Sequence, residues 1–267
     1  MTTGLTDTDA RVGRWVLALI AIVAIAAGVY YWTGREAAQP ATDMSPPVAV
    51  EPDPAQPVVE PPLETPDTPS LPALGQSDAE VLLQLDGLST AGRIESLLVP
   101  EDIIRRITAT VDNLTREKVA ARIRPVRPMD PPFIAEGTEA APVLGQANYV
   151  RYTSYVDFVE SLDLDQVVAA YVRLYPLFQE AYEELGNPTA HFNDRLIEVI
   201  DHLLDAPEIR GEIPLSRPSV MYQFADAGLE ARSAGQKFLI RMGPANADRI
   251  KTWLRDLRGR LAARRPT

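Results

Sequence analysis

The chain has 267 residues and a formal net charge of −11 at pH 7, with 46% hydrophobic side chains. It contains no cysteine, which excludes disulfide bonds, thiolate metal sites and cysteine nucleophiles. The absence of cysteine is compatible with an oxidising compartment without demonstrating one.

An unbroken run of uncharged residues, 15–32, begins close to the start of the sequence. As a helix it would reach roughly 27 Å, enough to cross the hydrocarbon core of a membrane. Arg11 and Arg14 precede it, and the basic flank of a membrane span stays in the cytoplasm. We therefore expect residues 1–14 to form a cytoplasmic tail and everything after residue 32 to lie outside the cytoplasm.

A cleaved secretory signal is the alternative interpretation of this segment, because Ala24-Ile25-Ala26 matches a small-x-small cleavage site. The apolar run continues through residues 29–32 with no polar stretch before the cut, which favours an uncleaved anchor. Ala24 and Gly28 form a small-xxx-small pair that could pack two spans together. Such pairs arise by chance in an alanine-rich helix, so the oligomeric state stays open.

A proline-rich, acidic linker follows at residues 33–76. Its central part, residues 37–72, holds eleven of the 24 prolines, six acidic residues and no basic residue. Such a segment cannot bury enough apolar surface to offset its ordering entropy, so we expect it to be disordered and extended. It would hold the following domain away from the membrane surface.

The remaining residues, 77–265, suit one domain with a substantial core. Helical periodicity dominates them, so we expect a mainly α domain of about six to eight helices with at most a small β-hairpin. Apolar spacing together with proline and glycine signals predicts helices over residues 103–114, 164–185, 192–204, 228–242 and 245–262.

Two details of this pattern are specific. The second helix keeps one apolar phase across Pro176, which predicts one kinked helix rather than two, ended by Gly186-Asn187-Pro188. Residues 219–224 carry bulky side chains between Pro218 and a turn, which makes them the best strand candidate, with Phe133-Ile134 as its partner.

A weak metal-site candidate lies on and just before the helix at residues 192–204. His191, Asp194, Glu198 and His202 fall within about 80° of arc at 3.6 residues per turn. Their spacing could chelate a divalent cation. The arc also lies opposite the apolar face, where any amphipathic helix carries polar residues, and we favour this second interpretation. No cofactor is predicted.

Aromatic side chains are dense between residues 149 and 182, which suggests a platform for carbohydrate or peptide. Most of them share helical phase with leucine and valine, so core packing is the favoured explanation. Tyr149 and Arg151 fall outside that stripe and are candidates for facing a ligand or partner.

Residues 249–267 carry seven basic side chains against Asp256 alone. The same stretch has an apolar stripe, and a basic amphipathic helix can lie on an anionic membrane or cell-wall polymer. We favour docking of this helix on the acidic body of the domain, because helical apolar faces normally seek a core.

Arg195 projects to the border between the polar arc and the apolar face of its helix. A guanidinium there can tie carboxylates or the ends of neighbouring helices together. The alternative is a ligand anchor, and we favour the structural role because border arginines usually pack.

Enzyme motifs of the G-x-S-x-G, phosphate-loop, G-x-G-x-x-G and H-E-x-x-H types do not occur. Carboxylate pairs such as Asp201 with Asp205, or Glu183 with Glu184, are routine on acidic helices. A catalytic site assembled only in the fold stays open.

Five stretches carry a resemblance to a known family: Asn148–Tyr152, Leu174–Tyr182, Phe192–Ile197, Ile200–Leu204 and Gly235–Gly243. Together they resemble the uncharacterised single-span envelope proteins of Gram-negative bacteria grouped as domain of unknown function 3014, over about residues 70 to 262. The resemblance implies a helical periplasmic domain behind an inner-membrane span and a variable proline-rich linker. It supplies no activity and no catalytic residue.

These features favour a membrane-anchored periplasmic scaffold or interaction module, held in the inner membrane by residues 15–32. Its expected partner is an envelope protein or the cell wall, and nucleic acid is not expected outside the cytoplasm. A cell-wall or glycan hydrolase whose carboxylates meet only in the fold is the alternative.

Overall fold

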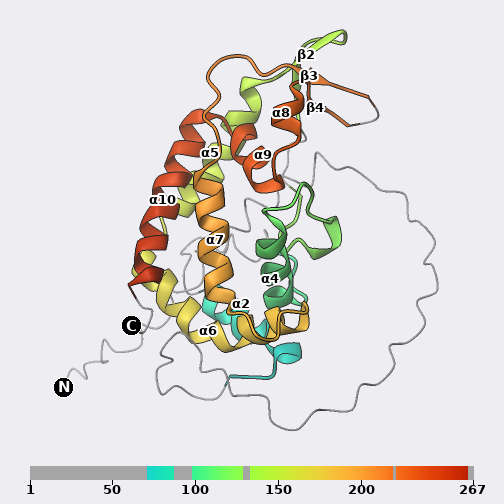
Figure 1. Ribbon diagram of the computed structural model, residues 1–267. Helices are drawn as coiled ribbons and strands as arrows, with labels where there is room; N and C mark the ends of the chain where they lie inside the picture. The colour runs from blue at the N-terminus through green and yellow to red at the C-terminus, as the bar shows by residue number, and fades with distance from the viewer. Residues whose placement is uncertain (1–70, 87–97, 129–132, 219–220, 264–267) are drawn as a thin grey trace, which may run out of the picture.

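A computed structural model describes residues 71–86, 98–128, 133–218 and 221–263. This part of the chain is mainly helical (Figure 1), which confirms the predicted mainly α class of the domain. None of the helices within it is long and apolar enough to cross a membrane. The predicted span at residues 15–32 and the linker up to residue 70 lie outside the described residues.

The described segments hold eight α-helices, two short 3-10 helices and four short strands. The helices are α2 (Asp78–Asp86), α4 (Ile103–Asn113), α5 (Gln146–Glu160), α6 (Leu164–Glu184), α7 (Phe192–Leu204), α8 (Ala227–Glu230), α9 (Ala234–Arg241) and α10 (Pro244–Ala262). The 3-10 helices are η2 (Leu74–Gln76) and η3 (Ala121–Ile123). The strands are β1 (Ala135–Thr138), β2 (Ala141–Leu144), β3 (Leu215–Ser216) and β4 (Gln223–Phe224).

The helices pack around one main hydrophobic core. Helices α7 and α10 lie side by side, and α4, α5, α6 and α9 each pack against one or both of them (Figure 1). Phe178 of α6 and Phe192 of α7 stack in this core with ring centroids 5.5 Å apart. A smaller cluster under the strands contains Leu144, Ile213, Leu215, Phe224 and Ile240. The small sheets therefore cap one end of the helical body.

Helix α6 is continuous across Pro176, as its unbroken apolar phase predicts. The Asp163 side chain caps its start by accepting hydrogen bonds from the backbone N–H groups of residues 165 and 166, at 3.0 and 3.3 Å. Gly186 has a φ of 94° directly after the helix ends, a conformation that glycine adopts without strain. The predicted end of this helix is confirmed.

The predicted single helix at residues 228–242 is wrong, because two helices, α8 and α9, occupy this stretch. Ser233 interrupts the pattern, since its hydroxyl accepts a hydrogen bond from the Gln236 N–H at 3.2 Å and so caps a new helix. The next two backbone N–H groups, of Ala234 and Gly235, donate to the carbonyls of Arg116 and Leu114. Bonds to the loop after α4 thus start α9 at a fixed place.

The strand expected within residues 219–224 is confirmed for its last two residues, which form β4, but its expected partner is wrong. Strand β4 pairs antiparallel with β3, with Leu215 opposite Phe224, and not with residues 133–134. A local pairing closes a shorter loop and costs less entropy. Strands β1 and β2 form a second antiparallel pair, so the described residues contain two two-stranded sheets rather than at most one hairpin.

The basic helix α10 docks on the body, as predicted. Its apolar stripe is buried, with Trp253, Leu254 and Leu257 each no more than 5% exposed. Two of its arginines form ion pairs with the neighbouring helices: Arg258 with Asp201 of α7 at 2.5 Å, and Arg260 with Asp165 of α6 at 2.8 Å. Its positive charge therefore complements the acidic helices that it covers.

Candidate functional site

The guanidinium of Arg195 joins α7 to the C-terminal end of α4. Its Nε donates to Asp112 Oδ1 at 2.9 Å, and its Nη2 donates to the Asp112 carbonyl oxygen at 2.7 Å and to Thr115 Oγ1 at 2.8 Å. Its Nη1 lies 2.9 Å from Glu198, and 16% of the side chain is exposed. These contacts hold two helix ends together, which is the structural role considered for this residue.

The four weak metal-ligand candidates have separate surroundings. His191 stands at the N-cap position of α7, Asp194 is exposed in its first turn, and Glu198 pairs with Arg195. His202 lies near the other end of the helix, with Nε2 2.8 Å from the hydroxyl of Ser233. Among the described residues, no three histidine or carboxylate side chains are grouped closely enough to hold a metal ion.

Stability should fall at acidic pH through His202. Burial lowers the pKa of its imidazole, and Arg195 and Arg232 lower it further, while Asp205 and Glu198 act in the opposite direction. Since the unfolded imidazole, with a pKa of about 6.5, binds the proton more readily, the stabilisation is present above that pH and lost as the pH falls.

We expect His202→Gln to reduce the loss of unfolding free energy between about pH 7.5 and pH 5.5, measured by urea denaturation at both values. Glutamine keeps a hydrogen-bonding group beside the serine hydroxyl but cannot be protonated. A variant with the same pH dependence as the wild type would show that His202 does not contribute to it.

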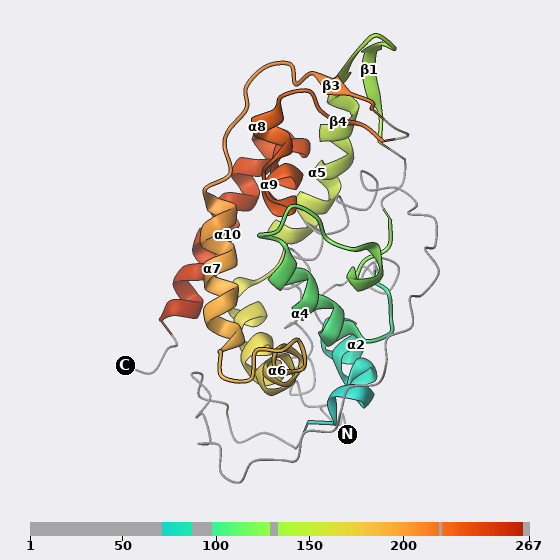
Figure 2. The ribbon, with the colours of Figure 1, turned by 45° about the vertical axis from the view of Figure 1, so that its right-hand side comes forward.

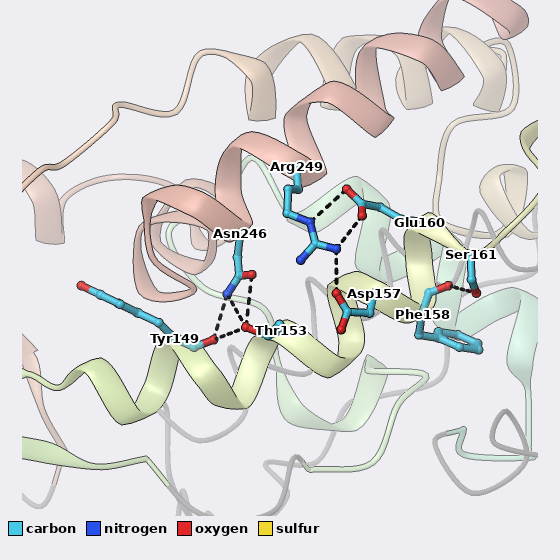
Figure 3. A network of polar contacts seen from close by, with 8 residues as sticks. All are labelled: Tyr149, Thr153, Asp157, Phe158, Glu160, Ser161, Asn246 and Arg249. Atoms are coloured by element: carbon cyan, nitrogen blue, oxygen red, sulfur yellow. Dashed lines mark hydrogen bonds and ion pairs between the residues drawn. The ribbon is translucent and has the colours of Figure 1, made fainter.

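Tyr149 lies where the start of α5 meets the start of α10 (Figure 3). Its carbonyl oxygen accepts a hydrogen bond from Asn246 Nδ2 at 2.8 Å. Its ring covers Gly243, since a Cβ atom at that position would lie 2.6 Å from the ring Cγ. Burial raises the pKa of the Tyr149 hydroxyl, and Glu136 raises it further. Tyr149 is half-buried and therefore packs with one side and leaves the other accessible.

Further along the same pair of helices, Arg249 of α10 reaches two acidic residues of α5 (Figure 3). Its Nε donates to Glu160 Oε1 at 3.1 Å, and its Nη2 lies 2.7 Å from Asp157 Oδ1. Together with the Asn246 contact, these bonds hold the start of α10 against both ends of α5. Tyr149 therefore lies at the surface of a contact between α5 and α10 that these hydrogen bonds and ion pairs hold in place.

Arg151, the other partner-binding candidate, points into the protein instead. It is 8% exposed, with its guanidinium carbon 5.2 Å from the centroid of the Tyr152 ring. Its Nη1 donates to Asn148 Oδ1 at 3.2 Å. Tyr152 in turn meets Phe238 of α9 edge to face, with centroids 5.3 Å apart. Although Arg151 lies outside the aromatic stripe, its side chain is therefore buried and not exposed.

Two further cations are buried beside this junction. Arg241, at the end of α9, is 2% exposed and stacks on Phe224 with its guanidinium carbon 4.9 Å from the ring centroid. Burial lowers the pKa of Arg241 to about 10. Lys237, 3% exposed, forms a 3.0 Å ion pair with Glu230. Helix α9 thus carries two buried cations in an acidic protein, of which Lys237 is paired with Glu230.

One carboxylate of each pair considered for hydrolysis is bound by an arginine. Arg258 donates from Nε and Nη2 to the two oxygens of Asp201, at 2.5 and 2.8 Å. Arg105 does the same to Glu184, at 2.7 and 2.9 Å, and lowers the pKa of that carboxyl. A general acid needs the opposite shift, so Glu184 is unsuited to that role.

Comparison with known proteins gives one match. A family model described as "Protein of unknown function (DUF3014)" covers residues 103–258, more than half of the chain. The chain belongs to this family. Neither the curated proteins nor the solved structures contain a match.

The DUF3014 match covers both α5 and α9, which meet where Tyr152 contacts Phe238. The sequence alone does not show that these two helices lie together. Local sequence patterns do not single out Asn148, Lys237 or Arg241 as candidates. All three lie in the stretches Asn148–Tyr152 and Gly235–Gly243 that carry the family resemblance. These residues can be recognised in the sequence as charged or amide side chains at positions that fall on the buried face of a helix.

Proposed function

We propose that this DUF3014 protein is a non-catalytic interaction module of the cell envelope, anchored by residues 15–32 with its helical domain in the periplasm. The uncharged run behind Arg11 and Arg14 supports the anchor, and the proline-rich residues 33–76 support a spacer. The partner is an envelope protein or the cell wall.

The observation that carries this proposal is that the candidate polar side chains bond to neighbouring helices. Arg195 and Asp112 bind α7 to α4, Asp201 pairs with α10, and His202 contacts Ser233 at the start of α9. Side chains that are committed to neighbouring helices build a rigid body, whereas a catalytic group must be free to exchange protons with a substrate. A rigid helical body behind a spacer suits a binding role.

The domain has two distinct ends. The described chain begins at residue 71, beside η2 and α2, and strands β1 and β2 lie at the opposite end of the molecule (Figure 2). With the spacer joined to residue 71, the strand end would face away from the membrane. Ile134 and Val150, near that end, are 41% and 73% exposed. Exposed apolar side chains beside the half-buried Tyr149 favour this end as the docking surface for a protein partner.

The topology is tested by reporter fusions. Alkaline phosphatase fused after residue 72 should be active, because it folds only outside the cytoplasm. Green fluorescent protein exported to the same position by the general secretion route should stay dark. The reverse pattern would show that the domain is cytoplasmic.

The binding role is tested against hydrolysis with isolated cell walls and detergent-solubilised full-length protein. We expect no release of soluble glycan or peptide fragments. Release of fragments that is abolished by a single carboxylate substitution, with the melting temperature unchanged, would replace the binding proposal with the hydrolase alternative.

A further inference from the structure

The guanidinium of Arg151 presents one complete edge without a partner. Its Nη1 is bonded to Asn148, and the Tyr152 side chain is a further polar neighbour of the guanidinium, but Nε and Nη2 are buried and meet no acceptor in hydrogen-bond geometry among the described residues. These two nitrogens lie on the same side of the planar group, so their N–H bonds are nearly parallel. Burying such donors without acceptors costs free energy. An acceptor that bonded to this edge would offset that cost.

Other arginines of the same protein show what this edge binds. Arg105, Arg249 and Arg258 each donate from Nε and Nη2 to the two oxygens of one carboxylate. This side-on, two-bond geometry matches the spacing of carboxylate oxygens and is among the strongest hydrogen-bonded pairings in proteins. In those three cases the carboxylate belongs to the chain itself.

The surroundings of Arg151 favour a negative ligand and hold the group in place. Asn148 Oδ1 fixes Nη1 and also accepts the Ile134 N–H at 3.1 Å, while the Tyr152 ring lies beneath the guanidinium. Glu230, the carboxylate bound to Lys237, also accepts the Phe224 N–H at 3.0 Å. Its two oxygens are thus engaged away from Arg151.

We propose that Arg151 is a carboxylate-binding residue, whose Nε and Nη2 take both oxygens of a carboxylate supplied by another molecule. The positive charge of Arg241 also acts on Tyr152, the residue whose ring lies beneath the Arg151 guanidinium; Arg241 has other interactions and is not itself the anchoring group. Arg151 directly follows the exposed Val150 in the chain, and its own side chain is 8% exposed. This assignment does not depend on the interaction role proposed above.

Thermal melting of the full-length protein in detergent tests the assignment, with sodium acetate replacing sodium chloride at constant ionic strength and pH. A ligand that binds only the folded state raises the melting temperature in a saturable way. We expect such a rise in the wild type. A melting temperature equal in acetate and chloride would overturn the proposal, as would a larger response to sodium phosphate than to acetate.

Three variants complete the test. Arg151→Met should abolish the acetate response, and Arg151→Lys, which keeps the charge but not the two-nitrogen edge, should weaken it several-fold and serves if the methionine variant does not fold. Arg210→Met is the control, because that side chain is 82% exposed and its loss removes the same charge from the surface. A response that persists in both Arg151 variants, or is lost equally in Arg210→Met, would contradict the assignment.

Discussion

Replacing Gly243 by alanine is expected to destabilise the domain by about 2–4 kcal/mol. Two effects add up at this position. Gly243 has φ 86° and ψ 157°, a region that residues with a side chain avoid. The new methyl group would also lie 2.6–2.9 Å from three ring atoms of Tyr149, where the ring is held between α5 and α10. Urea denaturation followed by circular dichroism measures the loss.

Gly259→Ala is the control, within α10, the helix that Gly243 directly precedes. No atom lies within 4 Å of a Cβ built at Gly259, and alanine is the better helix former. This change should therefore stabilise the domain by about 0.5–1 kcal/mol. If both substitutions altered the unfolding free energy in the same direction, the close packing of Tyr149 on Gly243 would be wrong.

Arg195→Ala should lower the unfolding free energy by about 2–4 kcal/mol, because it leaves a largely buried carboxylate without its main partner. The Asp112 side chain is 14% exposed, and its Oδ1 and its backbone carbonyl both accept from Arg195. Thr115 loses a bond at the same time. The end of α4 would then lose the ion pair and the hydrogen bonds by which Arg195 joins it to α7.

Arg116→Ala removes another arginine from the same carboxylate and serves as the control. Its side chain is 66% exposed, and its Nη2 lies 3.3 Å from Asp112 Oδ2. An exposed pair of this kind contributes about 0.2–1 kcal/mol at most. Equal losses in the two variants would show that burial of the Arg195 pair does not decide its strength. An Arg195→Ala variant of wild-type stability that loses its partner in cells would instead make Arg195 a binding residue.

The elements that the sequence predicts best are those with a clean apolar stripe and a strong terminator. Helix α7 begins and ends where its stripe does, and α6 continues across Pro176 because its phase does. Helix α5 has no such stripe, since Asn148 and Arg151 occupy its buried face. A helix that buries polar groups hides its own periodicity, which is why the sequence did not predict it.

The candidate residues could be chosen from sequence, but their surroundings could not. Arg195 was placed at a helix border, yet its partner Asp112 is 83 residues away and is brought there by packing of α4 on α7. Arg151 was expected to face a partner because it left the aromatic stripe, and the fold buries it beside α9. Non-local contacts of this kind are set by tertiary packing and leave no mark on local periodicity.

Site-specific photocrosslinking in living cells tests the central claim most directly, which is that the domain binds a partner through its strand end. A photoreactive amino acid replaces Val150, 73% exposed near the strands, or Leu83, 68% exposed on α2 at the opposite end. We predict a defined adduct from position 150 and none from position 83, with both variants melting like the wild type. Adducts from position 83 alone, or from neither position, would contradict the proposed binding surface.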